Sequence, residues 1–111
     1  MPATALPPAT WRRDDSFTLC PLAAMHDALP IAYPGIFALL HIDADGRETT
    51  IHVDEGGDVR WAVGRLLARP LVVRQRPTHV AIRYEPARTP EEHLTRRIQT
   101  ARYRVKFKPA A

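Results

Sequence analysis

Apolar and polar residues alternate most clearly over GIFALLHIDADGRETTIHVD, residues 35–54. Asp45-Gly46 lies near the centre of this stretch. It is a strong signal for a two-residue hairpin turn, because the favoured turn needs positive φ at both positions. A turn there pairs Ala44 with Arg47 and predicts one core face, made of Ile36, Ala38, Leu40, Ile42, Thr49, Ile51 and Val53. The opposite face then carries Phe37, Leu39, His41, Thr50, His52 and Asp54.

Two later segments have the period of helices with one face on the core. Asp58 is a good N-cap for the first, and Pro70 ends it. Its apolar stripe is Val59, Ala62, Val63, Leu66 and Leu67, with Arg60, Trp61 and Arg65 lying away from it. The second helix, residues 89–101, opens with Thr89 as N-cap, Pro90 at the first helical position and Glu92 closing a capping box. Leu94, Ile98 and Ala101 are the stripe that we expect to face the core.

Two further segments read as strands. Residues 78–86, THVAIRYEP, place Val80, Ile82 and Tyr84 inward, and residues 102–108 alternate basic and apolar side chains. Together these elements predict a single α+β domain over residues 34–111, with a mainly antiparallel sheet of three or four strands and two helices. Residues 1–33 are rich in proline and predict an irregular arm packed against the domain. Its first ten or so residues are expected to be disordered, and residues 22–28 to form one helical turn.

Composition narrows the class of protein. The 111 residues suffice for one domain, and the apolar content of 45% and charged content of 25% are ordinary for a soluble chain. No apolar run approaches the ~20 residues that span a bilayer, and the N-terminus does not read as a signal peptide. We therefore expect a cytoplasmic protein. The single cysteine, Cys20, excludes an internal disulfide, and nothing in the sequence predicts a cofactor.

Three short motifs suggest a family. They are PGIF at residues 34–37, IHVDEGGDVRWAV at 51–63 and VAIRYEPARTPEEHLTRRI at 80–98. Their order, hairpin, helix, strand and helix, resembles the GIY-YIG nuclease domain over roughly residues 34–100. The resemblance implies a GIY-YIG-like fold. It also implies a catalytic site built from two tyrosines, a helix arginine and a metal-binding glutamate.

The catalytic positions implied by this resemblance are occupied by other residue types. The two tyrosines fall on Phe37 and His52, the helix arginine on Ala62, and the glutamate on Arg96 or Arg97. A cation at the last position reverses the charge that a divalent metal needs. The balance favours a protein without nuclease activity. An alternative is a metal-dependent phosphodiesterase in which His52 replaces the tyrosine and Arg60 or Arg65 takes over from the helix arginine.

One hairpin face offers a candidate metal site. His41, His52 and Asp54 share it in the predicted register, and two imidazoles with a carboxylate could bind a metal or transfer protons. The simpler interpretation is that these three residues are solvated. No ligand from elsewhere in the sequence is implied.

Charge is distributed unevenly along the chain. Residues 1–68 carry nine acidic side chains against five arginines, whereas residues 69–111 carry eleven basic side chains against three glutamates. In the predicted last strand, alternate cations would lie about 6.6–6.8 Å apart, a spacing comparable to that of successive phosphates. The leading prediction is a non-catalytic nucleic-acid-binding domain whose phosphate contacts are Arg83, Arg96, Arg97, Arg102, Arg104, Lys106 and Lys108.

Two alternatives remain for the same basic side chains. They could protect an exposed edge strand from pairing with other molecules. The chain could also be a protein-interaction or self-associating module with no nucleic-acid role, and that hypothesis predicts an exposed apolar patch.

Overall fold

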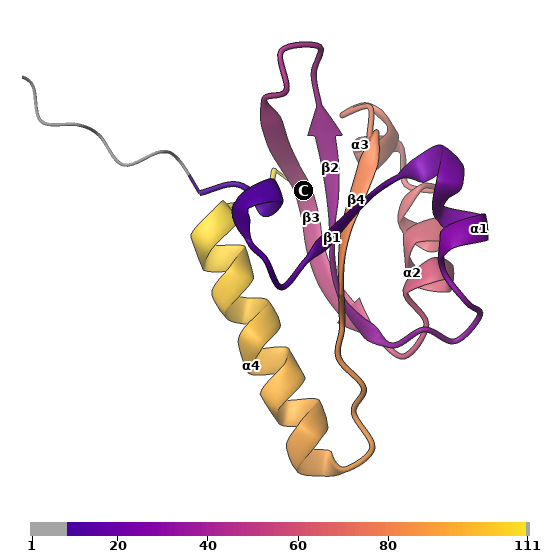
Figure 1. The fold of residues 1–111 in the computed structure, drawn as a ribbon, viewed down its shortest axis with the longest axis vertical. Coiled ribbons are helices and arrows are strands. Elements are labelled where there is room, and N and C mark those ends of the chain that lie inside the picture. The colour runs from indigo at the N-terminus through magenta and orange to yellow at the C-terminus, as the bar shows by residue number, and fades with distance from the viewer. Residues whose placement is uncertain (1–8, 111) are drawn as a thin grey trace, which may run out of the picture.

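The computed structural model describes residues 9–110 and contains one four-stranded antiparallel sheet in the order β1-β4-β2-β3 (Figure 1). The strands are β1 Thr18–Pro21, β2 Gly35–Ile42, β3 Glu48–Gly56 and β4 His79–Tyr84. The helical elements are η1 Trp11–Arg13, η2 Leu22–Ala24, α1 Met25–Ala28, α2 Val59–Leu66, α3 Pro70–Val73 and α4 Pro90–Phe107. The predicted α+β class and antiparallel sheet are confirmed, with two single-turn helices, α1 and α3, beside the two longer ones.

Helices cover both faces of the sheet (Figure 1). On one face, α1, α2 and α3 bury Phe37 and Leu39 of β2. On the other, η1 and α4 cover Ile36, Ala38 and Leu40. The prediction of a single core face was therefore wrong, because β2 is a central strand with hydrogen-bonded neighbours and packed helices on both sides.

The hairpin between β2 and β3 differs from its predicted form near the turn. Pairs at its open end keep the expected register, as in Leu39 with His52, but the register shifts by one residue between Leu39 and Leu40. Gly46 is the one residue of this turn with positive φ, at 82°, and its N–H bonds to the carbonyl oxygen of Asp43. The connection is thus a longer turn ending on Gly46. The shift leaves Thr50 buried and Thr49 exposed.

Both predicted helix starts are confirmed. The Asp58 carboxylate accepts a hydrogen bond from the Trp61 backbone N–H, and Thr89 with Glu92 forms the full capping box. Helix α2 buries Val59, Val63 and Leu66, as its stripe predicted. Pro70 follows the end of α2 and begins the short helix α3.

The N-terminal segment is more ordered than an irregular arm. The helical turn expected near residues 22–28 is present as η2 and α1, and residues 18–21 form the edge strand β1, which pairs with β4. Trp11 of η1 is completely buried. The disorder expected for the first ten or so residues falls largely on residues 1–8, which lie outside the described range.

The largest correction concerns the C-terminus. The predicted basic strand over residues 102–108 is instead the last part of α4, which continues without a break to Phe107. Tyr103 and Phe107, one helical turn apart, both pack against the Trp11 ring, and a strand could not bring both to one ring. The sequence near residues 102–108 does not by itself reveal the helix, because Trp11, the ring that these residues contact, belongs to η1 and lies far away in the sequence.

Candidate interaction surface on helix α4

Helix α4 lies along one side of the sheet (Figure 1). It is attached mainly by one row of side chains, with Arg104 adding contacts to Val53 and Asp54 of β3. Arg96 is buried, donating from Nε to the Glu55 carboxylate at 2.5 Å and from a terminal nitrogen to the Glu85 carbonyl at 3.1 Å. One turn later Thr100 is also buried, and its hydroxyl donates to the Arg96 carbonyl oxygen. The N-terminal half of α4 is therefore held by a buried ion pair on an inner face that is otherwise polar.

Aromatic rings hold the C-terminal half. The Phe107 ring stacks on Trp11 with centroids 3.9 Å apart, and Tyr103 meets Phe17 edge to face at 4.9 Å. Trp11 is fixed in turn, because its Nε1–H donates to the Thr50 hydroxyl at 2.9 Å. Arg96, Thr100, Tyr103 and Phe107 together form the inner row of α4.

The predicted core stripe of this helix faces solvent, which overturns that prediction. Leu94, Ile98 and Val105 are 59%, 46% and 75% exposed, and Ala101 between them is exposed as well. The outer row of α4 consists of Leu94, Ile98, Ala101 and Val105. The outer row has the same 4-3-4 spacing as the inner row, offset by two residues. At 3.6 residues per turn this offset is about 200°, so the rows lie on opposite sides of the helix.

The surface of the outer row has a shallow hollow that could receive a side chain. Ile98, Ala101, Arg102 and Val105 line a shallow, almost wholly apolar depression of about 390 Å³. These residues stand at i, i+3, i+4 and i+7, and the small Ala101 leaves the middle of the group low. An exposed row of apolar residues on one helix face is different from single scattered apolar residues, which need no explanation.

Cations flank this row. Arg97 is 75% exposed in its side chain and lies 4.0 Å from a Glu55 oxygen. Arg102 and Lys106 are exposed on the other flank, and within residues 9–110 neither makes an ion pair. The outer face of α4 is thus an apolar line with positive charge on both sides.

The structure divides the seven predicted phosphate contacts into two groups. Arg83, Arg96 and Arg104 make internal contacts: Arg83 with Glu85 and Tyr103, Arg96 with Glu55, and Arg104 with Asp54 and the Val53 carbonyl. Arg97, Arg102, Lys106 and Lys108 are exposed on α4 or at its end. Part of the charge asymmetry between the two halves of the chain is therefore neutralised inside the fold.

The candidate metal residues are only partly brought together. His52 Nε2 and an Asp54 oxygen lie 3.3 Å apart, whereas His41 Nδ1 lies 2.7 Å from the Arg76 carbonyl oxygen. Within residues 9–110, no group of three or more histidine, cysteine or carboxylate side chains is placed to hold a metal ion. Burial tends to raise the pKa of Asp54. The bond with His52, the Glu55 backbone N–H and the charge of Arg104 outweigh it and leave that pKa lowered.

The residues at the catalytic positions of the resemblance are divided between the two faces of the sheet. Phe37 is completely buried beneath α2, and Ala62 packs against the same core. Arg96 lies under α4, on the other face of the sheet. Arg60 and Arg65, the two possible replacements for the helix arginine, make other contacts. Arg60 donates hydrogen bonds to His26 and to the Leu29 carbonyl oxygen, and Arg65 lies over the Trp61 ring.

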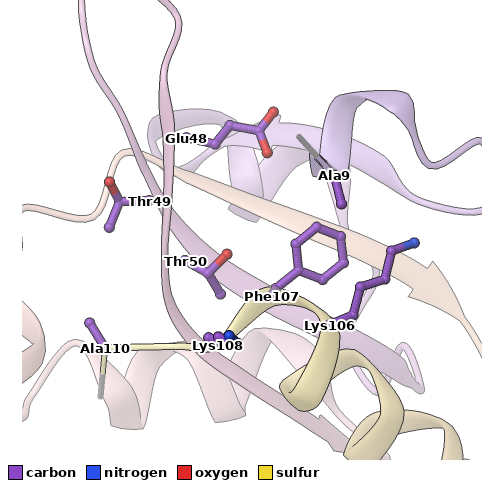
Figure 2. Close-up of a pocket in the computed structure, with 8 residues that line it drawn as sticks. All are labelled: Ala9, Glu48, Thr49, Thr50, Lys106, Phe107, Lys108 and Ala110. Atoms are coloured by element: carbon purple, nitrogen blue, oxygen red, sulfur yellow. The ribbon is translucent and has the colours of Figure 1, made fainter. Parts of the chain in front are cut away.

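A shallow pocket of about 400 Å³ lies where the end of α4 meets β3 (Figure 2). Figure 2 shows Glu48, Thr49 and Thr50 of β3 close to Phe107 and the end of α4. The Glu48 carboxylate in this pocket is already engaged, because it accepts a hydrogen bond from the Trp11 backbone N–H at 2.7 Å and pairs with Arg12. The pocket is a joint between packed elements and offers no set of converging reactive groups.

Comparison with known proteins adds no assignment. No protein-family model matches the chain, and no curated protein or solved structure matches it significantly. Among residues 9–110, no helix is both long and apolar enough to cross a membrane.

Proposed function

We propose that this chain is a non-catalytic protein-interaction module that binds its partner through the outer face of α4. The observation that carries the proposal is the outer row itself, with Leu94, Ile98 and Val105 about half to three-quarters exposed on one side of an 18-residue helix. An exposed apolar patch is the feature that distinguishes an interaction module from the other functions considered.

The way α4 is anchored supports this proposal. A helix with one apolar stripe normally buries that stripe, because burial of apolar surface is what stabilises it. Here the helix is held by an ion pair and by aromatic stacking on its inner row, and its aliphatic row is left outside. That arrangement keeps an apolar surface available on a rigid element of the domain.

The absence of catalysis is also part of the proposal. The order β2, β3, α2, β4 and α4 agrees with the layout of the GIY-YIG resemblance, which supports a domain of that kind. The catalytic positions implied by that resemblance are occupied by Phe37, His52, Ala62 and Arg96 or Arg97. Phe37 and Arg96 also lie on opposite sides of the sheet.

Nucleic-acid binding is the second candidate. It is favoured by the four exposed cations Arg97, Arg102, Lys106 and Lys108. It ranks below the first because three of the seven predicted phosphate contacts are engaged within the fold, and because the outer row is apolar. A nucleic-acid complex would weaken steeply with salt, in proportion to the number of phosphates neutralised.

Site-specific photo-crosslinking tests both candidates. A photoreactive amino acid is placed at Ala101 in the outer row or, as a control, at the exposed Ala68 beyond α2. Both proteins are irradiated in an extract of the source cells, with and without nuclease. The proposal predicts a protein adduct from position 101 alone that survives nuclease and is lost in Ile98→Gln. The captured protein, once purified, must bind the wild-type chain with the same dependence on Ile98.

Nuclease-sensitive adducts from position 101 would instead establish the second candidate. Identical adduct patterns from positions 101 and 68 would refute a specific role for α4.

A further inference from the structure

The spacing and charge of the outer row indicate which kind of protein could occupy it. This inference rests on the proposed function and concerns the same surface. We infer that the partner presents an amphipathic α-helix whose apolar seam is flanked by glutamate or aspartate, and that this helix packs lengthwise against α4.

The outer row has the residue spacing of a seam between two packed helices. Leu94, Ile98, Ala101 and Val105 repeat every four, three and four residues, which is the a/d pattern of a two-helix seam. In such a seam each apolar side chain inserts between four residues of the facing helix. The depression lined by Ile98, Ala101, Arg102 and Val105 has the i, i+3, i+4, i+7 arrangement that receives such a side chain.

The narrowness of the row favours a helix over a lipid surface. An interfacial membrane helix carries a broad apolar face, commonly with Trp, Phe and Leu. The outer row is one residue wide and is bordered directly by Arg97, Arg102 and Thr95. The aromatic residues of α4, Tyr103 and Phe107, lie in the inner row and are committed to Trp11.

The charges then select the partner's chemistry. With Ile98 and Val105 at a positions, Arg97 and Arg104 occupy g positions and Arg102 an e position. These flanks decide which helices pair. A second copy of α4 would bring arginine against arginine in either orientation, which disfavours self-association. A partner helix with acidic residues at its e and g positions would pair with Arg97 and Arg102 while its apolar a and d residues pack against the outer row.

Binding of designed peptides tests the inference directly. The probe is a fluorescein-labelled peptide of about three heptads with Leu at a and d and Glu at e and g, whose own charges keep it from self-pairing. Its twin carries Lys at e and g, and a third peptide has Ser in place of Leu. Fluorescence anisotropy at low salt measures the affinity of each for the purified chain.

The inference predicts that the Glu peptide binds at least tenfold more tightly than the Lys or Ser peptide. Ile98→Gln should weaken that binding at least tenfold. Arg97→Glu with Arg102→Glu should reverse the preference toward the Lys peptide. Arg69→Glu with Arg74→Glu is the matched control, because it changes the net charge equally at the ends of α3, on the other face of the sheet. The control should keep the preference for Glu.

Three results would overturn the inference. The first is equal binding of the Glu and Lys peptides, or binding of neither. The second is an Ile98-dependent dimer of the chain in sedimentation velocity, which would make a second copy the occupant. The third is Ile98-dependent binding to vesicles containing anionic lipid that is tighter than binding to the Glu peptide. In the first case, an Ile98-dependent protein adduct from position 101 would still uphold the proposed function, so the two failures are distinguishable.

Discussion

Trp11 should be the main anchor of helix α4, and its replacement by alanine is the most informative single change to the fold. Its ring is completely buried, stacks on Phe107 at 3.9 Å and meets Phe17 edge to face at 4.8 Å. Its indole N–H donates to the buried hydroxyl of Thr50 at 2.9 Å. One side chain thus joins η1, β3 and the end of α4.

The expected loss follows from these contacts. Removing a fully buried large aromatic side chain costs about 3–5 kcal/mol, and a lost buried hydrogen bond adds about 1 kcal/mol. A chain of this length is typically stable by roughly 5–15 kcal/mol. We therefore expect Trp11→Ala to lower the free energy of unfolding by about 4–6 kcal/mol. Trp11→Phe keeps a ring without the donor and should lose about 1–2 kcal/mol.

Urea unfolding followed by far-ultraviolet circular dichroism measures these differences. The chain supplies its own control, because its other tryptophan, Trp61, is 61% exposed and contacts Arg65 through a cation–π interaction. Trp61→Ala should change the free energy of unfolding by less than about 1 kcal/mol. Equal effects of Trp11→Ala and Trp61→Ala would refute the anchoring of α4 described above.

Three further predictions concern other parts of the fold. Gly35→Ala should destabilise the domain by about 2–3 kcal/mol, because the added Cβ would overlap a backbone carbonyl oxygen of β4. Gly64→Ala lies in open space on α2 and should stabilise the domain by about 0.5–1 kcal/mol, measured by the same urea unfolding. Arg96→Ala should cost about 3–5 kcal/mol, because it removes the buried partner of the largely buried Glu55 carboxylate and leaves only the exposed Arg97, at 4.0 Å, beside it. Arg97→Ala should cost less than about 1 kcal/mol. Equal losses would contradict the burial of the Arg96–Glu55 pair. Because the pKa of Asp54 is lowered in the folded state, its carboxylate stabilises the fold at pH values above the unfolded-state pKa of about 3.9. The difference in unfolding free energy between wild type and Asp54→Asn should therefore be largest near neutral pH and shrink as the pH falls below about 4. A difference that grows on acidification would contradict this prediction.

Local signals in the sequence were sufficient for some elements. The Thr89-Pro90-x-Glu92 capping box and the Asp58 cap each identified the first turn of a helix correctly. These signals depend only on residues within one turn, so they can be identified without knowledge of distant contacts. The antiparallel β2–β3 hairpin was also predictable, although its exact turn was not.

The direction in which α4 faces could not be obtained from periodicity alone. The helix carries two rows with identical spacing, and the aliphatic outer row resembles a core stripe more closely than Arg96, Thr100, Tyr103 and Phe107 do. The choice is made by Trp11 and Phe17 and by Glu55, all distant in sequence. The i, i+4 pair Tyr103 and Phe107 was a local sign of helix, but the alternation of charge over residues 102–108 suggested a strand instead.

Burial of both faces of β2 did have a signal in the sequence. The unbroken apolar run over residues 36–40 is typical of a strand covered on both sides, whereas a half-buried strand alternates apolar and polar residues. Reading that run as alternating left Phe37 and Leu39 on a solvent face.

The central claim is that Ile98 faces solvent while Thr100, two residues later, faces the sheet. Thiol labelling tests it most directly, with Ile98→Cys and Thr100→Cys each introduced into a Cys20→Ala chain. The structure predicts that Cys at position 98 reacts within a few-fold of its rate in urea, and that Cys at position 100 reacts ~100-fold more slowly because it must await local unfolding. Fast labelling at 100 with protection at 98 would mean that the outer row is core, and the proposed binding surface would not exist.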